Sequence, residues 1–226
     1  MILEDIASSR RTVPMTRARA NPADPRVRQR HETLRDAKRQ MVVEAARRVF
    51  QSHGLEGASI RLIAAEAGCT TGAIYPYFKG KEEIYAALLS ESLEGLRAFI
   101  AERIEAATDR LERARCALEA FYSYYRANPA ELSLGLYLFR GPGVRPVGLN
   151  PDLNRALNAQ LAESFDLMVH AIEAAGFDQA RDRAADGICH AVGLLIIAES
   201  GRMRVFKAKP EGLMRSYVDM ALPPSP

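Results

Sequence analysis

Residues 59–84 read Ser59-Ile-Arg-Leu-Ile-Ala-Ala-Glu-Ala-Gly-Cys-Thr-Thr-Gly-Ala-Ile-Tyr-Pro-Tyr-Phe-Lys-Gly-Lys-Glu-Glu-Ile84, and this stretch decides the fold. Ser59 is a preferred helix N-cap, and apolar residues then recur at helical spacing as far as Ala67. Gly68 suits a turn residue with a positive φ angle, and a second short helix is predicted from Thr71 to Phe78. Two such helices cannot bury enough surface alone, so flanking helices must brace them.

The two short helices are predicted to have an apolar inner face and a polar outer face. The inner set can share one small core: Ile60, Ile63, Ala64, Ala67, Ile74 and Phe78. The outer face of the second helix carries hydroxyls, aromatic rings and small groups, namely Thr70, Thr71, Gly72, Ala73, Tyr75 and Tyr77. Such a surface is suited to the major groove of DNA.

The pattern Ala64-x-x-Ala67-Gly68-x-x-x-Gly72-x-Ile74-Tyr75-x-Tyr77-Phe78-x-x-Lys81-Glu82-x-Ile84 resembles the DNA-binding signature of the TetR family. The resemblance implies an all-α fold, with an N-terminal three-helix DNA-binding domain that contains a helix-turn-helix. A larger helical domain for ligand binding and dimerisation would follow. The implied function is a sequence-specific transcriptional regulator, a repressor that leaves a palindromic operator when a small, largely apolar ligand binds.

Carried over residue by residue, the resemblance assigns a role to each DNA-facing position. Base-edge or groove-floor positions would be Thr71 and Gly72, with Ala73 close by, and Thr70 would meet a phosphate. Contacts to phosphates or sugars are implied for Tyr75, Tyr77, Lys81 and Arg61. Arg39 and Lys38 could reach the backbone or a neighbouring minor groove.

Structural alternatives remain open at several of these positions. Tyr75 could pack against the preceding long helix, and Lys81 could be a solvated lysine at a helix start. Pro76 departs from the usual pattern, because a proline inside the recognition helix removes a backbone hydrogen bond and would kink or tighten the last turn. Cys69 stands where an aliphatic residue is usual, and we interpret it as a small core-filling side chain.

Charge is distributed unevenly along the 226-residue chain, whose formal net charge is +3. Residues 1–40 contain ten Lys or Arg against five Asp or Glu, a net +5, while the remainder contains 21 against 23, a net −2. A basic arm ahead of a nearly neutral body suggests a polyanionic partner, although a solvated tail is an equal alternative for the first 20 residues.

Helical patterns continue to the C-terminus, each with a recognisable start. A helix is predicted from about Leu34 to His53-Gly54, and a long amphipathic one from Lys81 to about Ala107. The predicted N-caps of later helices are Asp109, Asn128, Asn150 and Asp178, the last for a helix that reaches about Phe206, and Pro210 opens a last short helix. Residues 140–148 form a predicted Gly/Pro loop. We therefore expect three parts: a basic arm (1–33), a DNA-binding domain (34–85) and a ligand-binding and dimerisation domain (86–222).

The C-terminal domain holds the candidate ligand and dimer residues. The candidate lining residues, whose aromatic rings and methionine would suit an apolar ligand, are Phe99, Phe121, Tyr122, Tyr125, Leu138, Phe139, Phe165 and Met168, although plain core packing is the alternative for any one of them. Small and apolar residues suited to a close helix–helix interface are Ile188, Ala191, Val192, Leu195 and Ala198. The expected partners are double-stranded operator DNA, a small-molecule inducer and a second copy of the chain.

Other functional classes find little support in the sequence. Cys189 and His190 are adjacent on a predicted helix and point about 100° apart, so they do not form a nucleophile–base pair, and we expect no enzyme. The three cysteines have no Cys-x-x-Cys spacing, so we expect no disulfide framework, metal or cofactor.

The apolar run from Ala191 to Ala198 is shorter than the roughly 20 residues that a bilayer needs, so we expect a cytoplasmic protein without a membrane partner. A membrane-active or partner-binding helical protein that uses the basic arm is the remaining alternative.

Overall fold

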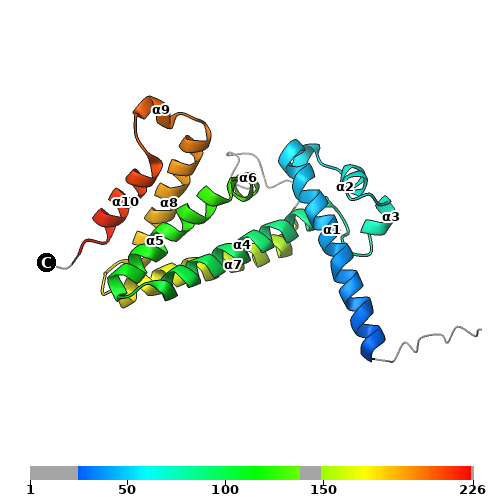
Figure 1. The fold of residues 1–226 in the computed structure, drawn as a ribbon, viewed down its shortest axis with the longest axis horizontal. Helices are drawn as coiled ribbons and strands as arrows, with labels where there is room; N and C mark the ends of the chain where they lie inside the picture. The colour runs from blue at the N-terminus through cyan, green and yellow to red at the C-terminus, as the bar shows by residue number, and fades with distance from the viewer. Residues whose placement is uncertain (1–24, 138–148, 225–226) are drawn as a thin grey trace, which may run out of the picture. The chain divides into compact units, whose positions relative to one another are not determined.

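The computed structural model describes residues 25–137 and 149–224, and these contain α-helices and no strand. The predicted all-α fold is confirmed. Figure 1 labels the helices, which are α1 (Pro25–Gly57), α2 (Ile60–Glu66), α3 (Thr71–Ile74), α4 (Lys81–Ala106), α5 (Arg110–Ala127), α6 (Pro129–Tyr137), α7 (Pro151–Ala174), α8 (Ala180–Glu199), α9 (Met203–Phe206) and α10 (Pro210–Ala221).

The chain divides into two compact units, residues 1–40 and 41–226. The described part of the first unit is helical from Pro25, nine residues before Leu34, where the sequence predicted the helix to begin. Its side chains are almost all exposed, so this part of the helix has no apolar stripe that a sequence pattern could detect. The boundaries of the three predicted domains stay a prediction.

The N-terminal helices of the second unit share one small core. Val43, Ala45 and Ala46 of α1 are fully buried, and so are Ile63 of α2 and Ile74 of α3. Phe50 of α1 packs edge-on against Tyr85 of α4, with ring centroids 5.2 Å apart. The predicted inner face is confirmed, since the remaining members of that set are buried or partly buried in the same cluster: Ile60, Ala64, Ala67 and Phe78.

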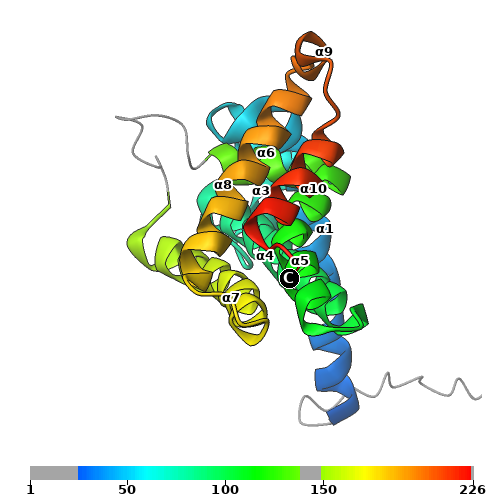
Figure 2. The same ribbon diagram turned by 90° about the vertical axis from the view of Figure 1, so that its left-hand side faces the viewer.

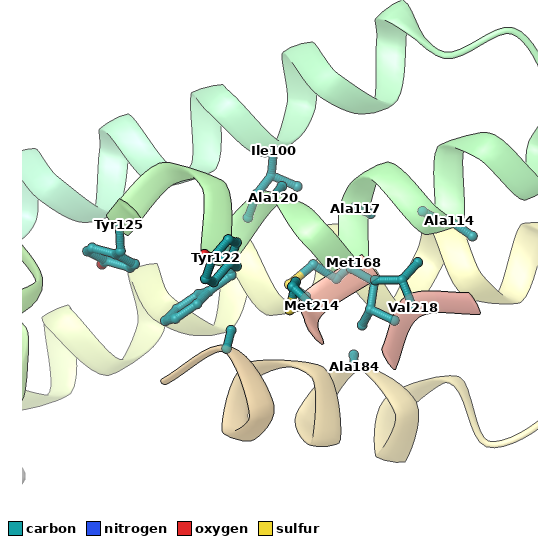
Figure 3. Close-up of a cluster of buried hydrophobic side chains, with 14 of the residues drawn as sticks. Ile100, Ala114, Ala117, Ala120, Tyr122, Tyr125, Met168, Ala184, Met214 and Val218 are labelled. Atoms are coloured by element: carbon teal, nitrogen blue, oxygen red, sulfur yellow. The ribbon is translucent and has the colours of Figure 1, made fainter. Parts of the chain in front are cut away.

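A second core lies among α4, α5, α7, α8 and α10 (Figure 3). Small residues of α5 such as Ala114 and Ala117 are fully buried there, which lets neighbouring helices approach closely. Met168 of α7 and Met214 of α10 fill the space between these helices. Met168, predicted as a pocket residue, is therefore a core residue.

Two of the four N-caps predicted for the later helices, Asp109 and Asn150, are confirmed by their hydrogen bonds. The side chain of Asp109 accepts from the Glu112 amide at 2.8 Å, and that of Asn150 accepts from the Asp152 and Leu153 amides at 3.0 and 2.9 Å. Asn128 behaves differently, because its side-chain amide donates to the Tyr124 carbonyl instead of capping α6.

Two predicted helices are shorter in the structure than in the sequence analysis. The recognition helix α3 ends at Ile74, so Pro76 follows the helix and does not kink it. The helix predicted to run to Phe206 stops at Glu199, where Gly201 with a φ of 70° separates α8 from α9. Residue 179, and not Asp178, is the N-cap of α8.

Candidate nucleic-acid interface and ligand pocket

The helix-turn-helix is built by local hydrogen bonds and one left-handed glycine. The Ser59 hydroxyl oxygen accepts from the Leu62 amide at 3.2 Å, which fixes the start of α2. Gly68 has a φ of 64°, as predicted for the turn, and the Cys69 amide then donates to the Ala64 carbonyl at 2.9 Å. This turn directs α3 away from α2 while Ile74 stays fully buried.

The predicted outer face of α3 is exposed. Thr71, Gly72 and Ala73 lie on the surface, and Tyr75 is 57% exposed. Thr70 is the N-cap of α3 but makes no side-chain capping bond, so its hydroxyl is not used by the helix. Tyr75 thus presents more than half of its side chain to solvent, whereas Tyr77 is partly buried against the core that α1, α2 and α3 share.

Lys81 has partners inside the protein. Its ammonium donates to the carbonyl oxygens of Leu55, Ala58 and Glu56, at 2.8, 3.0 and 3.4 Å. These carbonyls follow Gly54, whose φ of 66° interrupts the regular geometry of α1. The phosphate contact expected of Lys81 stays a prediction, and it would require the ammonium to weaken this set of bonds.

The other predicted cationic contacts are placed on exposed surfaces. Arg61 lies in the first turn of α2 and is exposed. Arg39 and Lys38 are exposed on α1 in the first unit. Cys69 is only partly buried and packs against the N-terminal core, in agreement with a space-filling role.

A cavity of about 500 Å³ lies inside the C-terminal bundle. We call it the ligand pocket and define it by its lining: Leu89, Ser92 and Leu93 of α4, Phe121 and Tyr125 of α5, Leu132, Gly135 and Leu136 of α6, Asn154, Leu157, Asn158, Leu161, Ala162 and Phe165 of α7, and Ile188 and Val192 of α8. Its volume is within the range of small-molecule sites.

The structure brings some of the predicted ligand residues to this pocket. Phe121, Tyr125 and Phe165 line it, whereas Phe99 instead packs against the Tyr124 ring at 5.8 Å. Tyr122 is buried in the core. Leu138 and Phe139 lie outside the described residues. Sequence reasoning missed Asn154, Asn158 and Ser92, because polar residues on amphipathic helices usually face solvent.

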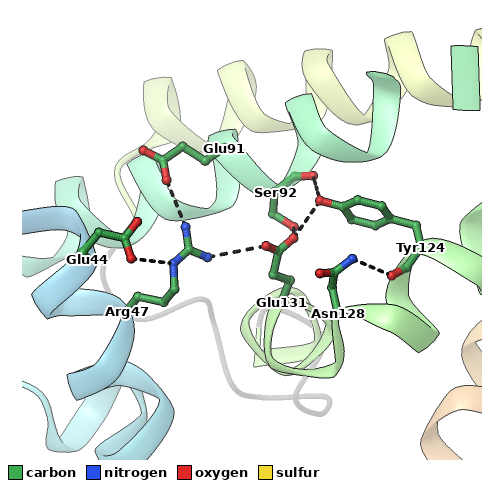
Figure 4. Close-up of polar contacts among 7 residues, drawn as sticks. All are labelled: Glu44, Arg47, Glu91, Ser92, Tyr124, Asn128 and Glu131. Atoms are coloured by element: carbon green, nitrogen blue, oxygen red, sulfur yellow. Dashed lines mark hydrogen bonds and ion pairs between the residues drawn. The ribbon is translucent and has the colours of Figure 1, made fainter. Parts of the chain in front are cut away.

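A polar network lies beside the pocket and joins it to α1 (Figure 4). The Arg47 guanidinium of α1 bonds to Glu91 of α4 at 3.0 Å and approaches Glu131 of α6 at 3.6 Å. The same Glu131 carboxylate accepts from the hydroxyls of Ser92, at 2.9 Å, and Tyr124, at 2.8 Å. Burial, followed by the hydrogen bond to Glu131, raises the pKa of Tyr124 well above its usual range, so its hydroxyl stays a donor.

The predicted dimer residues divide between two sides of α8. Ala191 and Leu195 are 0% and 2% exposed in the core of their own chain, so this part of the prediction is corrected. Ile188 and Val192 line the ligand pocket. Cys189 and Ile196 are exposed on another face of α8, whereas Ala198 is partly buried against the core of its own chain.

Among the described residues, no group of His, Cys, Asp and Glu side chains could hold a metal ion. Within the same residues, no helix has the length and apolar character needed to cross a membrane. The His190 ring stacks on Tyr217 of α10 at 4.4 Å, while Cys189 is exposed. The pair thus has the divergent directions expected from the sequence.

Comparison with known proteins supports the family assignment. Residues 42–88 match the profile of bacterial regulatory proteins of the tetR family. The chain is 32% identical over 90 residues to the HTH-type transcriptional activator FasR of Mycolicibacterium smegmatis, covering 40% of this chain and 41% of FasR. It is 38% identical over 65 residues to the HTH-type transcriptional repressor AcnR of Corynebacterium diphtheriae, covering 29% and 34%.

The fold is shared over a greater length than the sequence. The structure of FadR from Bacillus subtilis in complex with stearoyl-CoA superposes with a TM-score of 0.62 at 19% identity, covering 81% of this chain and 97% of FadR. The matched segments span less than half of FasR and of AcnR. Residues 42–88 therefore carry the sequence signature of tetR-family regulatory proteins, and the chain shares its helical fold with FadR.

Proposed function

We propose that the protein is a transcriptional repressor that binds operator DNA through α2 and α3 and leaves it when a small molecule occupies the ligand pocket. The observation that carries the proposal is the exposed outer face of α3. Thr71, Gly72 and Ala73 offer small and hydroxyl-bearing groups, while Ile74 anchors the helix from behind. A rigid helix with such a surface fits the major groove of DNA.

The division of roles on this surface is testable with two variants. Thr71→Val should change which bases are preferred, because Thr71 is the proposed base-edge contact. Arg61→Ala should weaken binding to every sequence, because it removes one phosphate contact. The slope of log affinity against log salt concentration should decrease in magnitude by about one. Affinities measured over a randomised operator set decide the point, and equal loss on all sequences for both variants would refute the assignment.

A small-molecule signal is supported by the ligand pocket and by the stearoyl-CoA complex of FadR, a protein of the same fold. Selecting genomic fragments that bind the purified protein would identify the operator. An operator that overlaps a promoter, with transcription rising when the gene is deleted, supports repression. Transcription that falls on deletion would show activation, which is the role named for FasR.

We further propose that a second copy of the chain covers the exposed apolar side chains of α8 and α10. These helices run side by side (Figure 2), and Ile196, Leu213 and Met220 are 45%, 39% and 73% exposed on them. A symmetric dimer would present two α3 helices to successive major grooves, so the operator should be a palindrome.

A further inference from the structure

We propose that the ligand pocket takes an uncharged molecule with a hydrocarbon body, whose hydrogen-bonding head group lies between Asn154 and Asn158. This inference rests on the proposed ligand-binding function and adds the chemical class of the ligand. Organic acids and organic cations are the classes that it excludes.

The lining of the pocket contains no Asp, Glu, Lys, Arg or His side chain among the described residues. A charged group that enters such a site loses its hydration without gaining a counter-ion, and an unpaired buried charge is strongly disfavoured. The leucine, phenylalanine and isoleucine side chains of the lining instead favour hydrocarbon. An uncharged ligand that is mostly hydrocarbon therefore fits the lining of the pocket.

Ser92 and Tyr125 provide the polar groups of the inner wall, and both are neutral hydroxyls. Burial raises the pKa of Tyr125, so it stays protonated at physiological pH. Glu131 lies behind Ser92, but its carboxylate is shared by Arg47, Ser92 and the Tyr124 hydroxyl. It is therefore not available as the counter-ion of a cationic ligand.

Asn154 and Asn158 lie one helical turn apart on the pocket face of α7. Neither carboxamide is hydrogen-bonded within the described part of the chain, and Asn158 is exposed, so the pair is at the rim. A carboxamide both donates and accepts hydrogen bonds, so the pair is matched to an amide, ester, ketone or alcohol head group.

Charged side chains near this rim are already paired. Arg155, which follows Asn154, approaches Asp152 at 3.6 Å. Glu163, beside the lining residue Ala162, approaches Arg97 of α4 at 3.9 Å. Within the described residues, these two pairs therefore add no net charge beside the pocket mouth.

The cavity volume limits the length of the ligand. About 500 Å³ would hold on the order of 17 groups of water size, at roughly 30 Å³ each. An eight-carbon chain with a small head group fits within this volume. Octanamide and octanoate are suitable probes because they have nearly the same shape and differ in charge.

The test is calorimetric titration of the full chain with octanamide, octanoate and octylammonium at about pH 8, where the acid and the amine are charged. Octanamide should bind at least about tenfold more tightly than either ion. Octanoate or octylammonium binding as tightly as octanamide would overturn the proposal, and so would the absence of binding by all three.

Variants locate the head group and test the rim charges. Asn154→Leu combined with Asn158→Leu should lower the affinity for octanamide by about tenfold, which is the effect of losing two modest hydrogen bonds. The same variant should keep its affinity for the neutral fluorophore N-phenyl-1-naphthylamine, which reports an intact pocket. Unchanged octanamide affinity would overturn the assignment of the asparagines. Arg155→Ala is the matched control and should leave octanoate affinity unchanged.

Operator binding, measured separately, keeps the two proposals distinct. If octanamide binds with the expected preference but leaves DNA affinity unchanged, the ligand class stands and ligand-controlled repression fails. If octanoate binds preferentially and releases DNA, repression stands and the ligand class fails.

Discussion

At the scale of single residues, Lys81 matches the family signature and yet has a structural role in this chain. An ammonium has three N–H donors, and three backbone carbonyls lie within hydrogen-bonding distance of the Lys81 nitrogen. Leu55 and Ala58, which supply two of these carbonyls, are themselves buried in the N-terminal core. Lys81 thus holds the start of α4 against the segment that follows Gly54.

Lys81→Met should therefore lower the stability of the protein. Hydrogen bonds to a charged group are worth about 1.5–3 kcal/mol each, and burying carbonyls without a donor adds to the loss, so we expect a decrease of at least about 2 kcal/mol. Denaturant unfolding of the full chain measures it, and Lys79→Met, at an exposed position two residues earlier, is the control. A variant of normal stability with weaker DNA binding would support the phosphate contact instead.

Residue patterns predicted the outer face of α3 well, and they did not predict the partners of Lys81 or Glu131. The first depends on helical periodicity and on one turn glycine, which are local in sequence. The second depends on contacts across long separations, such as Lys81 to Leu55 and Arg47 to Glu131. A single sequence contains no signal for such pairs.

At the scale of helices, α6 contacts both the ligand pocket and the DNA-binding helices. Leu132, Gly135 and Leu136 line the pocket. Leu134 belongs to the N-terminal core, and its carbonyl accepts from the Tyr85 hydroxyl. Through Glu131, α6 also meets Arg47 of α1. A ligand that displaces α6 would therefore disturb the helices that support α3.

Glu131→Gln should weaken the coupling between ligand and operator. Removing the charge of Glu131 weakens its contact with Arg47. The measured quantity is the DNA affinity without ligand divided by the DNA affinity with ligand, which is about 5–150 in typical allosteric proteins. In this variant the ratio should fall toward one. Glu44→Gln is the matched control, because Glu44 approaches Arg47 at 3.7 Å within α1 itself. A ratio unchanged in the Glu131 variant would contradict this route.

The start of α5 gives a pH-dependent contribution to stability. The Glu112 carboxylate accepts from the hydroxyl and the amide of Thr108, which lowers the pKa of Glu112. A lowered pKa means that the stabilisation is present above the unfolded value of about 4.3 and is lost as the pH falls through the folded value.

The difference in unfolding free energy between the wild type and Glu112→Gln should therefore shrink as the pH falls from about 7 to about 3. Thr108→Val removes the larger cause of the pKa shift and should reduce this pH dependence. Chemical denaturation at a series of pH values measures both effects. A difference that grows on acidification would contradict the assigned sign.

Helix ends show why element boundaries were harder to predict than the elements. The sequence predicts a recognition helix that extends to Phe78, which continues the apolar spacing, but the helix ends at Ile74 while Phe78 remains buried. Its amide bonds to the Ile74 carbonyl at 3.1 Å, so a turn preserves the helical direction after the helix has ended. Periodicity therefore reports burial more directly than helix length.

At the scale of the whole molecule, the proposed dimer would decide whether the exposed α3 surface can bind a palindromic operator. The small and apolar residues of α8 predict an interface with a second copy, but two of them, Ala191 and Leu195, are buried in the core of their own chain. Composition cannot distinguish a helix packed within its own chain from one packed against a second copy, because both kinds of close packing require small side chains. Ile196 and Met220 are exposed in the structure, so they are better candidates for contacts with a second copy.

Ile196→Glu combined with Met220→Glu should give a folded monomer, because two carboxylates would be buried without partners in the proposed interface. Light scattering at micromolar concentration measures the assembly, and Leu62→Glu, at a position of α2 that is 39% exposed, should remain dimeric. The monomer keeps α3 but loses the fixed spacing of about 34 Å between half-sites. The affinity of the monomer for a full palindrome should therefore fall to its affinity for one half-site. A monomer that still bound the full palindrome more tightly than one half-site would contradict the proposed arrangement.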